Sequence, residues 1–183
     1  SLTSYLAQTG FLYSKDYVQQ VLVKHYKYSE MLFQLFELMF SPSKHSSTKA
    51  ESLVAEMMSY LEGVDISAED KVLSNLRLII QATLRTNFYQ KDEVTGSYKK
   101  YFSFKFDSKK VPDLPLPVPF AEIFVYSNDF EGLHLRGGKV GRGGIRWSDR
   151  GEDYRREVLG LMKAQMAKNT IIVPTGSKGA FFV

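Results

Sequence analysis

The chain has 183 residues, with 24 Lys and Arg against 20 Asp and Glu, a formal net charge of +4 and no cysteine. Its 44% hydrophobic content is typical of a globular protein and too high for a disordered one. The lack of cysteine excludes a disulfide scaffold, a thiolate zinc site and a cysteine nucleophile. No apolar run approaches the ~20 residues that span a bilayer, and the first residues do not resemble a signal peptide. We therefore expect an intracellular, cytoplasmic protein without a membrane partner.

The last residues form an apolar run, from Gly179 to Val183. Natural termini are usually polar and frayed. We therefore expect the chain to be a fragment of a larger protein.

Charge and glycine are unevenly distributed along the chain. Residues 1–132 hold 14 basic and 16 acidic residues, a charge of −2, whereas residues 133–183 hold 10 basic and 4 acidic residues, a charge of +6. Ten of the 13 glycines lie between Gly132 and Gly179. Exposed backbone N–H groups beside cationic side chains suit an anionic ligand. The alternative is a surface loop region whose Lys and Arg serve solubility.

Helical spacing of apolar residues predicts four helices in the first half of the chain. Ser14 is a predicted N-cap, and Ser67 with Asp70 resembles a capping box. We interpret the apolar stripes of these helices as core. The expected ranges are 14–25, 29–40, 50–61 and 67–85.

After Thr86 the period changes. Phe102, Phe104 and Phe106 alternate with polar residues, which is typical of a strand. The prolines within 111–119 impose an extended path, either as a stiff connector or as a ligand for another protein. We expect strands at 101–107, 121–126, 132–136 and 170–174, and a helix at 149–168. The predicted fold class is α+β, with a helical segment over 1–90 and a mixed, α/β-like sheet with a long helix over 91–183.

Three cations stand out in the basic part, namely Arg142, Lys168 and Lys178. Lys168 continues a helical stripe, so it either satisfies the helix dipole or projects into a cleft. Lys178 lies between Gly176 and Gly179 just after a predicted strand, and a Lys near other cations can act as a general acid or base. The chain has neither a P-loop nor a dinucleotide fingerprint. His25, His45 and His134 have no metal-ligand spacing, so we expect no metal.

Several segments together resemble the very large, bacterial-type NAD-specific glutamate dehydrogenases. The segments GLHLRGG, RGGIRWSD, EVLGLMKAQMAKN and PTGSKG carry the resemblance, and three upstream segments support it. They occupy residues 132–138, 142–149, 157–169 and 174–179, with support from 81–90, 101–105 and 111–117. The resemblance implies part of a substrate-binding domain and a parent enzyme that converts L-glutamate to 2-oxoglutarate and ammonium.

The resemblance also implies residue roles. Arg142, Gly143 and Gly144 match the segment that binds the side-chain carboxylate of the substrate, Gln165 and Lys168 match the pair that holds the α-carboxylate, and Lys178 matches the catalytic Lys. Arg142 stands where the family has Lys, and Ala180 replaces a Gly. Lys168 and Lys178 are ten residues apart where smaller family members usually have twelve, so the path of the loop before Lys178 is open.

The resemblance further implies NAD as cofactor, bound by a domain that this chain does not contain, and a homo-oligomeric parent. The isolated chain should then be inactive. A basic, Gly-rich nucleic-acid-binding module, with Trp147 and Phe181 as stacking residues, is the alternative, as is a protein-interaction module. The glutamate pattern of the cations favours an enzyme without a nucleic-acid partner.

Overall fold

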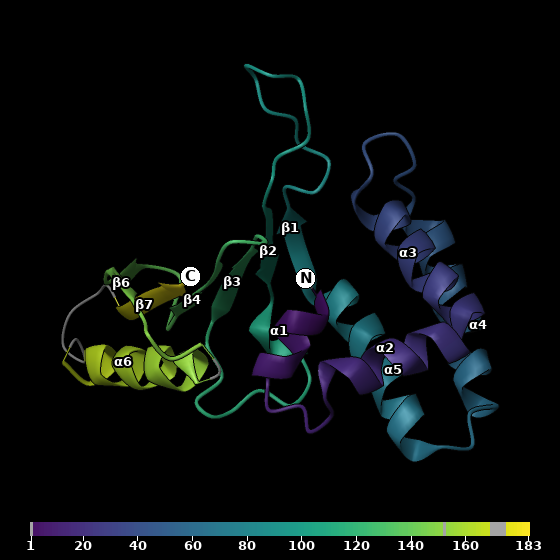
Figure 1. Cartoon of the computed structure of the whole chain (residues 1–183), viewed down its shortest axis with the longest axis horizontal. Coiled ribbons are helices and arrows are strands. Elements are labelled where there is room, and N and C mark those ends of the chain that lie inside the picture. Colours follow the sequence, from purple (N-terminus) through teal and green to yellow (C-terminus); the bar gives the residue numbers. More distant parts are fainter. Residues whose placement is uncertain (1, 152, 169–174) are drawn as a thin grey trace.

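The computed structural model describes residues 2–151, 153–168 and 175–183 as a sheet covered by helices, which confirms the α+β class. In the described part the sheet has seven strands in the order β1-β2-β3-β4-β7-β5, and β6 also pairs with β7. Figure 1 shows α2 to α5 beside one end of the sheet and α6 beneath the other. The helices are α1 (Leu2–Gln8), α2 (Lys15–Lys24), α3 (Tyr26–Phe40), α4 (Ser47–Glu62), α5 (Ser67–Ala82) and α6 (Tyr154–Lys168), with a 3-10 turn η1 (Ser108–Lys110). The strands are β1 (Thr83–Thr86), β2 (Phe102–Phe106), β3 (Ala121–Tyr126), β4 (Glu131–Arg136), β5 (Gly141–Arg142), β6 (Ile145–Trp147) and β7 (Thr175–Phe182).

The four predicted N-terminal helices are present, and side-chain caps define the starts of two of them, whereas α3 begins at Tyr26, three residues before its predicted start, without such a cap. Ser14 caps α2 by accepting a hydrogen bond from the backbone N–H of Tyr17, as predicted. Ser46 caps α4 in the same way, so α4 begins three residues before its predicted start. The predicted capping box at Ser67 is wrong, because Ile66 occupies the N-cap position of α5 and Ser67 is already helical.

Helix α5 ends at Ala82 rather than at the predicted Arg85. Thr83 to Thr86 form β1 instead, which pairs antiparallel with β2. Thr83 is buried, and its hydroxyl donates a hydrogen bond to the carbonyl oxygen of Ile79 in the last turn of α5. The pairing with β2 therefore overrides the helical spacing, and the β-branched threonines favour the strand.

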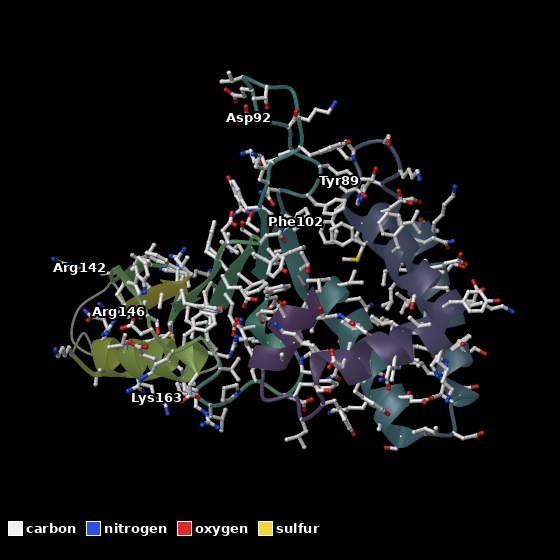
Figure 2. All side chains as sticks on the ribbon, viewed as in Figure 1. Tyr89, Asp92, Phe102, Arg142, Arg146 and Lys163 are labelled. Carbon is white, nitrogen blue, oxygen red and sulfur yellow. The ribbon has the colours of Figure 1, made fainter. Side chains whose placement is uncertain are left out.

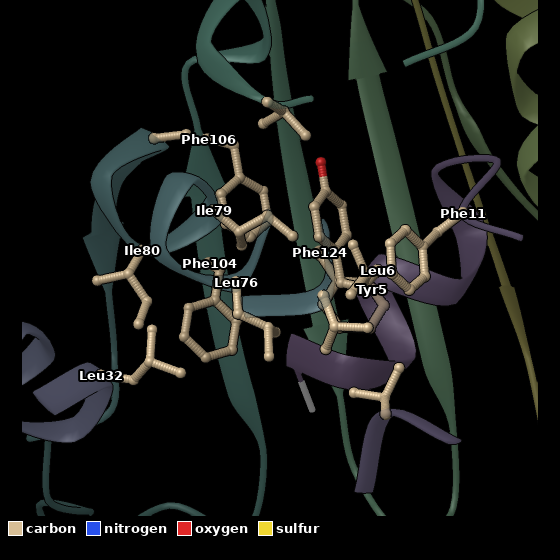
Figure 3. Close-up of a cluster of buried hydrophobic side chains, with 14 of the residues drawn as sticks. Tyr5, Leu6, Phe11, Leu32, Leu76, Ile79, Ile80, Phe104, Phe106 and Phe124 are labelled. Atoms are coloured by element: carbon tan, nitrogen blue, oxygen red, sulfur yellow. The ribbon is translucent and has the colours of Figure 1, made fainter. Parts of the chain in front are cut away.

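The first helix, α1, was not predicted and lies at the centre of the core. Tyr5 is fully buried and stacks on Phe106 with ring centroids 4.3 Å apart. Its ring also contacts Phe124, with centroids 5.3 Å apart. Figure 3 shows this cluster, in which α1 and α5 meet β2 and β3. A seven-residue helix is too short for its period to be read from the sequence, so tertiary packing defines it.

The helices pack on one face of the sheet. Among the described residues, the aromatic contacts and ion pairs between helices and strands lie on this face. The strand register places Phe124, Leu133 and Ala180 on the same face. Phe36 of α3 contacts Phe104 on this face, and Tyr154 of α6 contacts Phe182. The hydrophobic core is continuous beneath α1 to α6. The expected division into 1–90 and 91–183 stays a prediction, which limited proteolysis would test.

The opposite face of the sheet is open at its glycine-rich end. An apolar hollow of about 480 Å³ lies there, lined by residues of β3, β4, β6 and β7. Ile145 is 69% exposed and Trp147 is 58% exposed. In the described residues no helix is both long and apolar enough to cross a membrane.

Three predictions concern the segments that connect the strands. Residues 107–120 connect β2 to β3, and Val111 is buried in the core, which favours a connector within the fold over a free ligand segment. The long helix begins at Tyr154 rather than at 149. The predicted strand at 170–174 lies outside the described residues.

Candidate functional site

Lys178 lies in the middle of strand β7. It was expected just after a strand, but it lies within one, because residues Thr175–Phe182 pair along both edges. On one side β4 runs antiparallel, with Leu135 opposite Lys178. On the other side β5 and β6 run parallel to β7, with Gly141 opposite Thr175 and Ile145 opposite Gly179. In the fold, the glycines on either side of Lys178 allow close packing against neighbouring segments.

Two of these glycines are required by close approach. A Cβ at Gly143 would overlap the carbonyl oxygen of Ser177, so only glycine lets this segment lie against β7. A Cβ at Gly176 would lie 2.7 Å from the backbone nitrogen of Met166 and 2.8 Å from the Cβ of Gln165. Gly176 therefore lets the C-terminal half of α6 pack directly on β7. These contacts bring Gln165 and the segment 142–144 to the same stretch of β7 as Lys178.

The side chains of Arg142 and Lys178 share the face of the sheet that α6 covers. Lys178 is two residues from Ala180 and four from Phe182, whose ring contacts Tyr154 of α6. Because side chains alternate along a strand, Lys178 lies on the same face as Phe182. Arg142 is the register partner of Gly176, which also lies on this face. The structure thus brings together Arg142, Gly143, Gly144, Gln165 and Lys178.

Lys168 lies one turn beyond Gln165, as the last residue of α6, and is exposed. The predicted stripe of α6 is confirmed at its start, because Tyr154 and Val158 are fully buried. Further along, the core position is taken by Met162, also fully buried, while Leu161 is only partly buried. Lys168 therefore sits at an edge of the helix, and no described interaction joins it to Arg142 or Lys178.

The cations at this end of the sheet differ in whether they have an acidic partner. Within the described part of the chain, Arg142, Lys168 and Lys178 have no carboxylate within ion-pair distance. By contrast, Arg146 pairs with Glu157 at 3.1 Å, and Arg155 pairs with Glu122 at 2.6 Å. Among the described residues, Arg142 and Lys178 are thus cations without an acidic partner beside a glycine segment, an arrangement that suits an anionic ligand.

Two sets of residues around the site were missed by the sequence analysis. Glu157 forms an ion pair with Arg146 and accepts a hydrogen bond from Ser148, and Arg155 is buried against Glu122 and Tyr5. An acidic residue in the first turn of a helix indicates dipole stabilisation in the sequence, not a strand contact. No periodic signal could have revealed Tyr5, because its helix was not predicted.

A metal-dependent site finds no support in the described residues. Among positions 2–151, 153–168 and 175–183, no three His, Asp or Glu side chains gather as potential metal ligands. His134 of β4 is the register partner of Gly179, the residue after Lys178. Its ring lies against Gly179 on the open face. Burial lowers the pKa of His134, and the charge of Arg136 adds to the effect.

Comparison with known proteins gives matches over nearly the whole chain. Residues 56–183 match the sequence model of a family described as bacterial NAD-glutamate dehydrogenase, catalytic domain, and residues 1–42 match glutamate dehydrogenase, helical motif 3. The NAD-specific glutamate dehydrogenase of Pseudomonas aeruginosa is 47% identical over 182 residues, which cover 97% of this chain and 11% of the relative. The enzyme of the same name from Mycobacterium tuberculosis is 41% identical over 182 residues, which cover 98% of this chain and 11% of the relative.

A third relative gives the same result. The NAD-specific glutamate dehydrogenase of Halomonas elongata is 47% identical over 178 residues, which cover 97% of this chain and 11% of the relative. The chain thus spans about 11% of the length of these relatives. These matches favour a dehydrogenase over the alternative of a nucleic-acid-binding or protein-interaction module.

Proposed function

Because this chain belongs to the family of bacterial NAD-glutamate dehydrogenase catalytic domains, we propose that it forms part of the substrate site of an NAD-dependent glutamate dehydrogenase. The parent enzyme converts L-glutamate, NAD⁺ and water to 2-oxoglutarate, ammonium, NADH and a proton. The observation that carries this proposal is the group of cations around β7 that have no acidic partner among the described residues, together with the close-packed glycines there. It agrees with a substrate that has two carboxylates and one reacting carbon.

The two carboxylates of the substrate are assigned to two parts of the site. Arg142 pairs bidentately with the side-chain carboxylate, and the backbone N–H groups of Gly143 and Gly144 lie beside it. Gln165 and Lys168, at the end of α6, hold the α-carboxylate. Binding both ends of glutamate holds the α-carbon in a fixed position. Because the substrate's freedom of movement is already lost on binding, the entropy cost of reaching the transition state is smaller.

Lys178 is assigned the proton transfers. Its side chain is partly buried on the same face as Arg142, next to the segment 142–144, which supports this assignment. In the proposed reaction the α-carbon loses a hydride and the amine becomes an imine. Lys178 then takes a proton from the attacking water and later returns one to the leaving ammonia.

NAD⁺ supplies the hydride acceptor, and the described residues do not fit it. The dinucleotide fold binds its cofactor where a parallel strand leads through a glycine-rich turn into a helix. In the described part of this chain α6 follows β6 after the sequence SDRGED, which has one glycine. We therefore assign NAD binding to another part of the parent protein and derive no step from it.

The central test is Lys178→Ala in the full-length enzyme. We expect kcat for L-glutamate oxidation to fall by about 10²–10⁴-fold, the usual contribution of a general acid–base group. Lys163→Ala is the matched control, because Lys163 is an exposed lysine of α6 on the side away from the strands (Figure 2). Near-normal turnover by the Lys178 variant would contradict the assignment.

We also propose a homo-oligomeric parent in the cytoplasm, as the sequence analysis expected. Light scattering of the full-length enzyme measures its mass, and a mass equal to one chain contradicts the oligomer. Cell fractionation with an activity assay tests the compartment.

A further inference from the structure

The carboxylate of Glu157 joins the strand β6 to the helix α6. Arg146 of β6 places its Nη2 atom 3.1 Å from Oε1 of Glu157. Ser148, just after β6, donates its hydroxyl to Oε2 of the same carboxylate at 2.7 Å. Both oxygens of Glu157 are therefore engaged by one short segment, and we call Arg146, Ser148 and Glu157 the Glu157 clamp.

The clamp is anchored to β7 as well as to α6. The backbone N–H of Ser148 donates to the carbonyl oxygen of Phe181 at 2.8 Å, and Arg146 is the register partner of Ala180. Ser148 is 3% exposed, and the Glu157 side chain is 16% exposed. The bond from the Ser148 hydroxyl is shielded from water, whereas the Arg146 side chain of the ion pair is 57% exposed. The buried Ser148–Glu157 bond therefore holds the geometry of the clamp, and the Arg146 pair adds to it.

Glu157 lies on the same edge of α6 as the residues assigned to the α-carboxylate. Positions 157, 161, 165 and 168 follow one another at spacings of four, four and three, which places them in one row along a helix. Gln165 lies about 12 Å beyond Glu157 along the helix axis, so a tilt of about 5° at the clamp would move it by about 1 Å. A displacement of this size can strongly weaken a site that depends on position.

The other half of the site lies at the opposite end of the clamp. Gly144 is two residues before Arg146, and its carbonyl oxygen accepts a hydrogen bond from the backbone N–H of Gly179 at 3.1 Å. The clamp therefore adds a side-chain connection between β6, which follows the segment 142–144, and α6, beside the direct packing of α6 on β7. A change at this connection would alter the distance between the two places where the substrate's carboxylates would bind.

We propose that Glu157 is a positioning residue, which fixes the tilt and roll of α6 through Arg146 and Ser148 and so sets the spacing between Arg142 and the Gln165–Lys168 pair. This inference rests on the proposed function, in which these residues hold the two carboxylates of glutamate. Glu157 itself does not bind the substrate. It keeps the spacing between the two carboxylate-binding parts equal to the length of a five-carbon dicarboxylate.

The test is Glu157→Gln in the full-length enzyme. The amide keeps one oxygen for Ser148 but turns N–H donors or a neutral oxygen toward Arg146, so the charge pair is lost. We expect KM for L-glutamate to rise about tenfold, equivalent to about 1.4 kcal/mol, while kcat falls less than about threefold and KM for NAD⁺ is unchanged.

The matched control is Asp153→Asn. Asp153 pairs with Arg156 at 3.5 Å beside the first turn of the same helix, but both side chains are largely exposed and neither contacts β6. Asn keeps the helix-capping ability of Asp. We expect this variant to leave KM for glutamate unchanged, and a rise equal to that of Glu157→Gln would overturn the proposal.

A purely structural role for Glu157 predicts a different result. Partial unfolding would reduce the active fraction, so Vmax would fall while KM for glutamate stayed constant, and this outcome would overturn the proposal. Arg146→Gln provides a second measurement, because it breaks the same pair. The double variant should raise KM no further than Glu157→Gln alone, whereas a multiplied effect would contradict a shared mechanism.

Failure of this proposal can be separated from failure of the proposed function. If Lys178→Ala abolishes turnover and Glu157→Gln leaves KM unchanged, the dehydrogenase assignment stands and the clamp does not. If Lys178→Ala retains turnover, the site assignment itself is contradicted.

Discussion

The two ends of the sheet are packed in different ways. At the end covered by α1 and α5, Tyr5, Phe106 and Phe124 are fully buried and their rings touch. At the glycine-rich end, β5 and β6 are mostly exposed and one face is open over the apolar hollow. The cations Arg142 and Lys178 there have no carboxylate partner among the described residues.

This difference separates stability from the proposed chemistry. Burial of large aromatic side chains is the main source of folding free energy. Unpaired cations on a shared face repel one another, so they are costly unless a ligand binds them. A site that keeps them is therefore best attached to a sheet whose stability comes from elsewhere. Variants at the two ends should accordingly differ in what they affect.

The largest expected effect lies where the end covered by α1 and α5 meets α6, in the buried pair of Glu122 in β3 and Arg155 in α6. Glu122 is 0% exposed and also accepts a hydrogen bond from Tyr5 at 2.7 Å. Burial alone would lower the pKa of Arg155, but the facing Glu122 carboxylate raises it, so the guanidinium stays charged. Glu122→Gln leaves this charge buried without a counter-ion and should reduce the free energy of unfolding by about 3–5 kcal/mol, as measured by urea denaturation.

An exposed ion pair provides the control for Glu122. Lys71 pairs with Asp113 at 2.8 Å, and both side chains are more than a third exposed. Asp113 has a φ of 58°, a conformation that Asn also tolerates, so Asp113→Asn changes the charge without backbone strain. We expect a loss of less than about 1 kcal/mol. Equal losses at the two sites would contradict the contrast between a buried and a solvated pair.

Much of the end covered by α1 and α5 could be predicted from the sequence. The cap at Ser14 and the alternation of Phe102, Phe104 and Phe106 are local signals, and both are confirmed. The missed features depend on distant partners. Helix α1 is stabilised because Tyr5 packs on β2 and β3. Strand β1 forms because Thr83–Thr86 can pair with the backbone of β2.

The second prediction concerns Gly143 at the glycine-rich end. A Cβ at this position would overlap the carbonyl oxygen of Ser177, so Gly143→Ala must push the segment 142–144 away from β7. The displaced Arg142 would bind the substrate carboxylate less well. We expect KM for L-glutamate in the full-length enzyme to rise by at least about tenfold, or 1.4 kcal/mol.

Gly144 is the matched comparison for this steric effect. A Cβ at Gly144 would have no atom within 4 Å, so Gly144→Ala meets open space. The rise in KM should therefore be much smaller than for Gly143→Ala. If the two alanine variants raise KM equally, close approach to Ser177 is not what Gly143 provides.

The sequence predicted the residue types of the candidate site better than their setting. The cations Arg142, Lys168 and Lys178 were recognised, but glycine-rich composition indicated loops where the fold has β5, β6 and β7. Strands of two or three residues carry no readable alternation, and parallel partners are far apart in the chain. The Glu157 clamp was missed for the same reason, since its partners meet only after β6 and α6 have packed.

The smallest expected effect is a pH dependence from His134, between the two ends. Burial, with the charge of Arg136, lowers the pKa of His134 below its usual value of 6.5, and its Nδ1 atom is buried without a hydrogen-bond partner. As the pH falls through 6.5, the unfolded chain takes up a proton there before the folded chain does, so stability is lost. His134→Gln removes this term. Urea denaturation at pH 7.5 and 5.5 should therefore show a smaller loss of stability at the lower pH for the variant than for the natural chain. An equal loss in both would mean that His134 titrates alike in the folded and unfolded states, and that its burial at the open face does not disfavour its charge.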